Sequence, residues 1–106
     1  MNESRYQWKL IQKLRELFPG CMILKNDPAY MQGVPDIIIL FNDRWAMLEI
    51  KISEDANFQA NQVYYINLLN EMSYAAFVNP ENEEDVLYDL QLTFGVIRPT
   101  RVSQSK

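Results

Sequence analysis

Two apolar segments separated by a turn constrain this chain more than any other feature. Residues 37–41 and 44–51 are mostly apolar, and an Asn-Asp pair lies between them. This pattern is typical of a β-hairpin. If the Asn-Asp pair forms the whole loop, Asp36 lies directly opposite Glu49, with the Cβ atoms roughly 5 Å apart on one face of the sheet.

Lys51 follows Glu49 by two residues, so its side chain is expected on the same face as the two carboxylates. Like charges directly opposite each other destabilise a strand pair, and strands this apolar are expected to be buried on both faces. Three arrangements would relieve this repulsion: protonation of one carboxylate, neutralisation of one charge by Lys51, or binding of a divalent cation between the acids. A cation also explains why both acids are present.

Two short motifs surround these residues: a Gly-x-Pro-Asp motif ends at Asp36, and Glu49 and Lys51 form a Glu-x-Lys motif. These motifs resemble those of the PD-(D/E)XK nuclease superfamily, in particular its VRR-NUC branch and the related archaeal-type Holliday junction resolvases. Glu3 matches the acidic residue that opens the first helix of the family, and Gln62 matches the glutamine on the helix after Glu-x-Lys. The resemblance covers most of the chain and predicts one nuclease domain over residues 1–106.

This resemblance implies an α/β fold with a restriction-endonuclease-like core, in which helices flank a central mixed β-sheet. It implies a Mg²⁺- or Mn²⁺-dependent endonuclease that acts on DNA, with Asp36, Glu49 and the backbone carbonyl of Ile50 as metal ligands. Lys51, Gln62 and Glu3 are the further catalytic candidates. Related small nucleases lead us to expect a homodimer and branched substrates such as Holliday junctions or flaps.

The absence of histidine independently narrows the chemistry. It excludes His-dependent nucleases, Ser-His-Asp hydrolases and His-containing zinc deaminases. Carboxylate oxygens remain as ligands, and these suit Mg²⁺ or Mn²⁺. The single cysteine, Cys21, excludes an internal disulfide.

The charge distribution bears on DNA binding. A net charge of −4 and a pI near 4.7 argue against a uniformly basic surface. Positive charge is nevertheless concentrated in residues 1–26 and 98–106, whereas residues 70–90 are strongly acidic. The residues expected to contact DNA are a stripe along the first helix and two residues of the next loop, namely Arg5, Lys9, Lys13, Lys25 and Asn26. Many VRR-NUC members have His and Asn in that loop, so the roles of Lys25 and Asn26 are open.

Periodicity and turn residues predict the other elements. We expect helices over residues 4–18 and 58–72, the second capped within residues 53–57, and strands over residues 21–24 and 74–78. Asn79 and Pro80 are expected to begin a third helix that ends near Leu90. The basic tail from Arg98 is expected to be mobile unless a partner orders it.

We expect a soluble cytoplasmic protein, because no apolar stretch approaches the length of a membrane span and the N-terminus does not resemble a signal peptide. Two other functions compete with the nuclease. One is a catalytically silent nucleic-acid-binding or regulatory module with the same fold, and the other is an acidic protein that occupies a partner's nucleic-acid groove. The Asp-Glu-Lys set argues against the first, and the basic ends argue against the second.

Overall fold

The computed structural model describes residues 1–103. Along the chain the elements are α1 (Glu3–Leu17), β1 (Met22–Lys25), β2 (Ile37–Phe41), β3 (Arg44–Ile50), α2 (Ala60–Met72), β4 (Tyr74–Val78) and α3 (Glu83–Thr93). The predicted strands 21–24 and 74–78 and the predicted first helix are confirmed to within one residue at each end.

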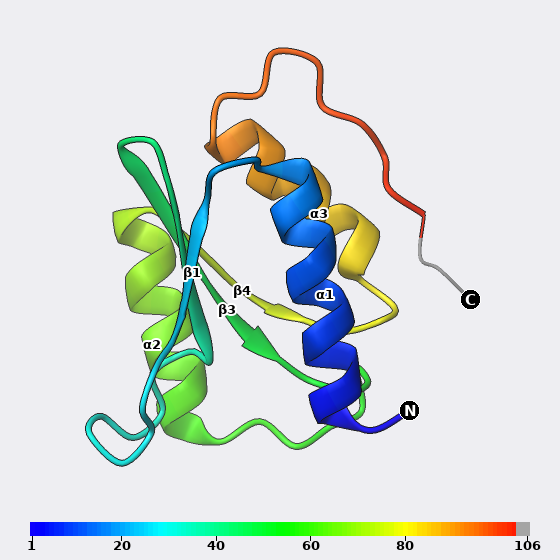
Figure 1. The fold of residues 1–106 in the computed structure, drawn as a ribbon. Coiled ribbons are helices and arrows are strands. Elements are labelled where there is room, and N and C mark those ends of the chain that lie inside the picture. Colours follow the sequence, from blue (N-terminus) through cyan, green and yellow to red (C-terminus); the bar gives the residue numbers. More distant parts are fainter. Residues whose placement is uncertain (104–106) are drawn as a thin grey trace.

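The four strands form one mixed sheet in the order β1-β2-β3-β4. Neighbouring strands among β1, β2 and β3 are antiparallel, whereas β4 is parallel to β3 and follows it through α2. Figure 1 shows α1 and α3 on one face of the sheet and α2 on the other. The chain is therefore an α/β protein with a four-strand mixed sheet flanked by helices.

The register of the β2–β3 hairpin is the predicted one. Phe41 pairs with Arg44 and Ile37 pairs with Leu48, so only two residues form the loop. Asn42 adopts a positive φ of 56°, a conformation that asparagine tolerates better than most residues. The same register, continued by one step, sets Asp36 opposite Glu49.

Alternating side chains of the sheet divide the core in two. One cluster joins the sheet to α1 and α3 and includes Leu10, Leu14, Ile37, Ile39, Leu48, Ile50, Leu87 and Leu90. Met47, Ala75 and Ile66 form a smaller cluster beneath α2. Because side chains alternate along a strand, Glu49 shares its face with Met47 and lies under α2.

The start of α2 differs from the prediction. The helix begins at Ala60, and its N-cap is Gln59 rather than a residue within 53–57. Gln59 and Gln62 have the arrangement of a capping box, in which the Gln59 N–H donates to Gln62 Oε1 at 3.1 Å and the Gln62 N–H donates to the Gln59 carbonyl at 3.0 Å. These reciprocal bonds satisfy the first turn and place the helix start next to the end of β3.

The boundaries of α3 are also shifted, from the predicted Pro80 and Leu90 to Glu83 and Thr93. The backbone N–H groups of Asn79 and Asn82 each donate to the other residue's side-chain oxygen, at 2.8 and 2.9 Å. This reciprocal turn replaces the expected first helical turn. The helix continues beyond Leu90, and Gln91 in its last turn is buried and donates to the Leu87 carbonyl at 3.1 Å.

The basic tail contacts α3 over the part of it that the structure describes. The side chain of Gln91 donates to the Thr100 carbonyl at 2.8 Å and accepts from the Thr100 N–H at 2.9 Å. Arg101 donates to Asp85 at 2.8 Å and lies over the ring of Tyr88. The tail therefore packs against the core as far as Val102, and the predicted tail beyond Ser103 lies outside the described residues.

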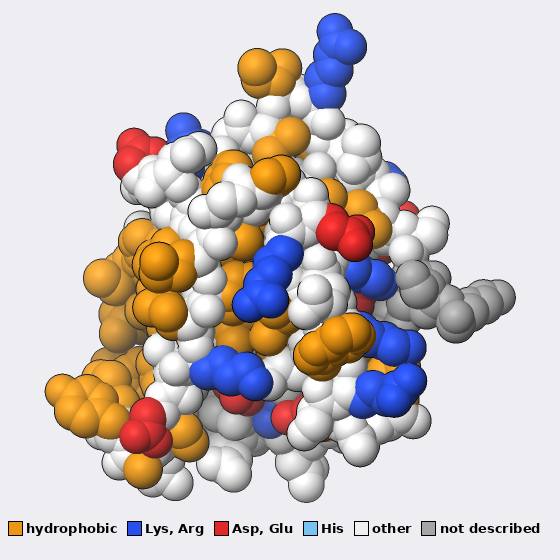
Figure 2. All heavy atoms as spheres, in the orientation of Figure 1, with side chains coloured by type: hydrophobic (Ala, Val, Ile, Leu, Met, Phe, Trp, Pro, Cys, Tyr) orange, Lys and Arg blue, Asp and Glu red, His pale blue; other side chains and the backbone are white. Residues whose placement is uncertain are grey.

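Surface chemistry varies around the molecule. Figure 2 shows Lys and Arg side chains spread over the face that carries α1, and hydrophobic side chains along the edge where β1 and α2 lie.

Within residues 1–103, no helix has both the length and the apolar character needed to cross a membrane.

Candidate active site

The segment before β2 holds Asp36 in a defined position. The side chain of Asn26 donates to the Pro35 carbonyl at 2.7 Å, and its backbone N–H donates to the Asp36 carbonyl at 2.9 Å. Gly33 has a φ of +92°, and a Cβ there would lie 2.6 Å from the side chain of Asn61 on α2. Glycine is therefore required at this position for the loop to pack against α2.

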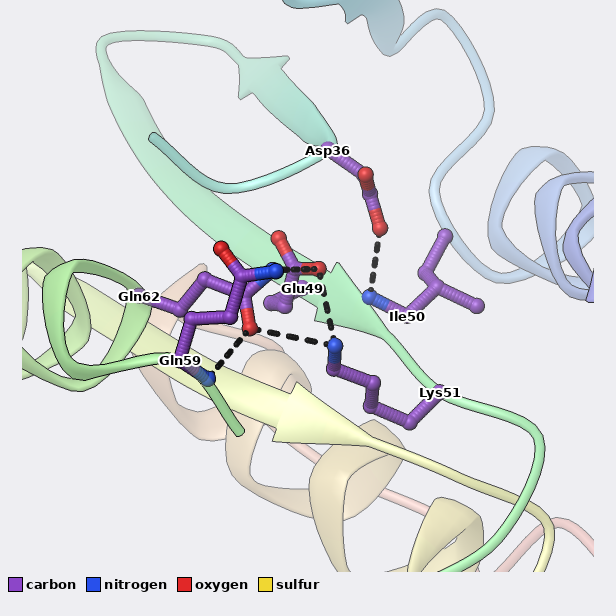
Figure 3. A network of polar contacts seen from close by, with 6 residues as sticks. All are labelled: Asp36, Glu49, Ile50, Lys51, Gln59 and Gln62. Atoms are coloured by element: carbon purple, nitrogen blue, oxygen red, sulfur yellow. Dashed lines mark hydrogen bonds and ion pairs between the residues drawn. The ribbon is translucent and has the colours of Figure 1, made fainter. Parts of the chain in front are cut away.

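The carboxylate of Asp36 crosses to the neighbouring strand. Its Oδ2 accepts the backbone N–H of Ile50 at 2.8 Å, as Figure 3 shows. This bond directs the side chain toward the end of β3, where Glu49 and Lys51 also lie. Asp36, Glu49 and Lys51 thus lie near one another, as the hairpin register predicts.

Gln62 links the other polar groups of the site. Its Nε2 donates to Glu49 Oε2 at 3.2 Å, and its Oε1 accepts from Lys51 Nζ at 3.1 Å. The same Oε1 accepts the backbone N–H of Gln59 at 3.1 Å, so the capping box fixes the orientation of the amide. Lys51 Nζ lies 3.8 Å from Glu49 Oε2. Through its two partly buried bonds, Gln62 thus holds the carboxylate of Glu49 and the ammonium of Lys51 close together.

Glu49 is only 5% exposed, and this burial raises its pKa to about 7. The negative charge of Asp36 is the second cause, and Lys51 acts in the opposite direction. The charge of Glu3 raises the pKa further, as does a hydrogen bond that the carboxyl groups of Asp36 and Glu49 can share. Glu3, at the start of α1, is therefore within electrostatic reach of the site.

These groups fit a hard divalent cation in donor type. Asp36 and Glu49 each have an oxygen outside the bonds to the Ile50 amide, Gln62 and Lys51. Together with a carbonyl such as that of Ile50, they would supply the oxygen ligands that Mg²⁺ takes alongside several waters. Within residues 1–103, no group of three or more acidic or cysteine side chains is arranged to hold a metal ion.

The residues expected to contact DNA lie in different environments. Arg5 and Lys25 are exposed and Lys9 is half-buried, whereas Lys13 Nζ lies 2.6 Å from the buried carboxylate of Glu83. Asn26 is engaged with the backbone that carries Asp36. Lys13 and Asn26 therefore have structural partners within the protein.

The ion pair between α1 and α3 has no counterpart in the local sequence pattern. Glu83, within the acidic segment, is 1% exposed and lies 2.6 Å from Lys13 Nζ, and both residues line a hollow of about 450 Å³. No local pattern indicates which acid of such a run is buried. The capping box did have a signal, because Gln59 and Gln62 have the spacing of this motif.

Comparisons with models of protein families, with curated proteins and with solved structures find no match to this chain.

Proposed function

We propose that this protein is a metal-dependent endonuclease that hydrolyses DNA phosphodiester bonds, built on a restriction-endonuclease-like core. The observation that carries the proposal is the convergence of Asp36, Glu49 and Lys51 at the end of one hairpin, with Gln62 of α2 bound to two of them. The antiparallel β1-β2-β3 order, followed by α2 and the parallel strand β4, supports the proposed core.

In this proposal, Asp36, Glu49 and the Ile50 carbonyl hold Mg²⁺ or Mn²⁺. Such an ion, when bound, lowers the pKa of a water and offsets negative charge on the phosphate. Lys51 stabilises the charge that develops on the phosphoryl oxygens, which its compact ammonium can do at short range. Gln62 holds Lys51 and Glu49 in fixed orientations through its two hydrogen bonds, and Glu3 contributes negative charge directly or through a water.

The proposed DNA contacts follow from side-chain availability. Arg5, Lys9 and Lys25 are the candidates for phosphate contact, whereas Lys13 and Asn26 act mainly in positioning. Few basic residues and an acidic net charge predict weak binding that declines with salt. Contacts of this kind report the shape of the DNA rather than its sequence, which favours branched substrates such as flaps and four-way junctions.

We further propose that the protein acts as a homodimer. Tyr64, Leu68 and Met72 are exposed at intervals of four residues and line the outer side of α2. We call this set the α2 outer stripe. A two-fold interface along it would bring two sites to one DNA molecule, as paired cuts across a junction require.

A cleavage assay tests the nuclease proposal. Single-stranded, linear duplex, flap and four-way DNA would be incubated with Mg²⁺ or Mn²⁺ and, separately, with EDTA. We expect metal-dependent cutting that favours the branched forms, and its loss in Asp36→Asn and Lys51→Met. Asp43→Asn is the matched control, because it makes the same chemical change in the exposed turn of the same hairpin. Equal activity of Asp36→Asn and Asp43→Asn would refute the proposed site.

A catalytically silent nucleic-acid-binding module is the second candidate. It is favoured by the lack of a preformed group of three metal-binding side chains within residues 1–103 and by the engagement of Glu49 with Lys51 and Gln62. DNA binding without cleavage by the wild-type protein, under every metal condition, would select this function over the nuclease.

A further inference from the structure

One exposed aromatic ring lies next to the proposed site. Phe58 precedes the N-cap of α2 and is 44% exposed. Lys51 Nζ lies 5.9 Å from the centre of its ring. Figure 3 shows the neighbouring residue Gln59 beside Lys51 at the start of α2. The ring therefore borders the polar groups without belonging to either core cluster.

The ring of Phe58 packs against the ring of Phe77. Its centroid lies 4.4 Å from that of Phe77, and the two planes are inclined by 46°. Phe77 is the residue of β4 that pairs with Glu49 of β3. Packing on Phe77 thus fixes Phe58 over the strand pair that carries the site, and Phe58 keeps 44% of its surface exposed. An aromatic platform fixed in advance binds at a lower entropic cost than a mobile one.

The charges near Phe58 favour a phosphate at Lys51 and a neutral group at the ring. The ammonium of Lys51 is the charged group shown at the ring and would attract a phosphate. Glu54 and Asp55, exposed in the same connection between β3 and α2, would disfavour phosphate elsewhere along it. A nucleotide with its phosphate at Lys51 and its base over Phe58 satisfies both preferences.

We propose that Phe58 is a stacking platform for an unpaired nucleobase next to the phosphate that is cut. This inference rests on the proposed nuclease function and narrows its substrate class to DNA with unpaired nucleotides at the cleavage point. The 5.9 Å from Lys51 Nζ to the ring centre is short enough for the base to belong to the same nucleotide as the phosphate at Lys51 or to the adjacent one, since nucleotides of one strand are spaced by ~3.4 Å. A base can reach the ring only after leaving the duplex stack, which is easiest in single strands, flaps and junction branch points.

Phe58→Leu and Phe58→Tyr test the stacking role. Leucine keeps apolar contact with Phe77 but has no aromatic face, whereas tyrosine keeps the face. Binding would be measured with Ca²⁺ in place of Mg²⁺, on a single-stranded oligonucleotide and on a flap that carries 2-aminopurine at successive positions near the branch. We expect Phe58→Leu to weaken binding about 5-fold to 100-fold and to abolish quenching at one position, and Phe58→Tyr to retain both. Leu92→Ala, which removes an exposed apolar side chain from α3, is the control.

The outcomes separate this inference from the nuclease proposal. If the wild-type protein cuts flaps but Phe58→Leu binds and cuts them equally well, stacking is refuted and the nuclease stands. If nothing is cut but Phe58→Leu loses binding to single strands, stacking stands and the nuclease is refuted. If Phe58→Leu weakens binding to linear duplex and to single strands by the same factor, stacking is also refuted, because a paired base cannot stack on the ring.

Discussion

Replacing Glu49 with glutamine should stabilise the metal-free protein at neutral and higher pH. A pKa of about 7, against an ordinary value of 4.5, corresponds to roughly 3 kcal/mol of unfavourable free energy when the carboxylate is ionised in the folded state. Because folding raises this pKa, the favourable contribution of the protonated form is complete below the unfolded pKa and is lost as pH rises through the folded one. Glutamine keeps an oxygen that can accept from Gln62 Nε2 and carries no charge.

Urea unfolding in EDTA, followed by tryptophan fluorescence, provides the measurement. We expect the free energy of unfolding of Glu49→Gln, minus that of the wild type, to increase by roughly 2 to 3 kcal/mol between about pH 5 and about pH 8. The comparison cancels the pH effects that other groups contribute to both proteins. Glu54→Gln, in the exposed connection after β3, is the control and should show no such increase.

Mg²⁺ should cancel most of the stability difference between Glu49→Gln and the wild type at the higher pH. Cation binding to the folded wild type adds about 2.7 kcal/mol when the metal concentration is 100 times its dissociation constant, whereas Glu49→Gln lacks one of the two carboxylates. A difference between the two proteins that is independent of pH would refute the reasoning from burial. Equal stabilisation of both by Mg²⁺ would refute the role of Glu49 as a ligand.

Three other predictions test the scaffold and the assembly. Lys13→Met should destabilise the fold by about 3 kcal/mol in urea, since it leaves the buried Glu83 without its partner, and a loss no greater than that of Lys9→Met would contradict this. Gly33→Ala should cost about 1 to 3 kcal/mol because of its positive φ and the contact with Asn61, and wild-type stability of this variant would show that the loop can rearrange. Leu68→Glu, which puts a charge in the α2 outer stripe, should give monomers in sedimentation at micromolar concentration, whereas a monomeric wild type, with and without DNA, would remove the dimer proposal.

The parts of the fold predicted correctly are those with local causes. Residues 37–41 are apolar enough to be buried, and a two-residue loop leaves one register for the return strand. The proximity of Asp36 to Glu49 follows from that register, and alternation then places Lys51 beside them. Pro19 and Gly20 ended the first helix in the predicted place for equally local reasons.

The errors came from contacts between residues whose pairing no local rule specifies. The start of α3 depends on the reciprocal bonds between Asn79 and Asn82, and the contact of the tail with α3 depends on the bonds between Gln91 and the backbone of Thr100. A lysine stripe on a helix is usually solvated, so the pattern could not indicate that Lys13 meets a buried acid 70 residues away.

The sequence by itself determined the hairpin, the pairing of two acids and a lysine on one face, and the alternation of helices and strands, because each depends on side-chain period or turn chemistry over a few residues. Only the tertiary structure decided how that group is held. The packing of α2 across the sheet brings Gln62 to Glu49 and Lys51 and buries the carboxylate enough to raise its pKa. The packing of α2 also places Phe58 beside Lys51. Burial and contacts of this kind depend on how whole elements pack, which no local pattern specifies.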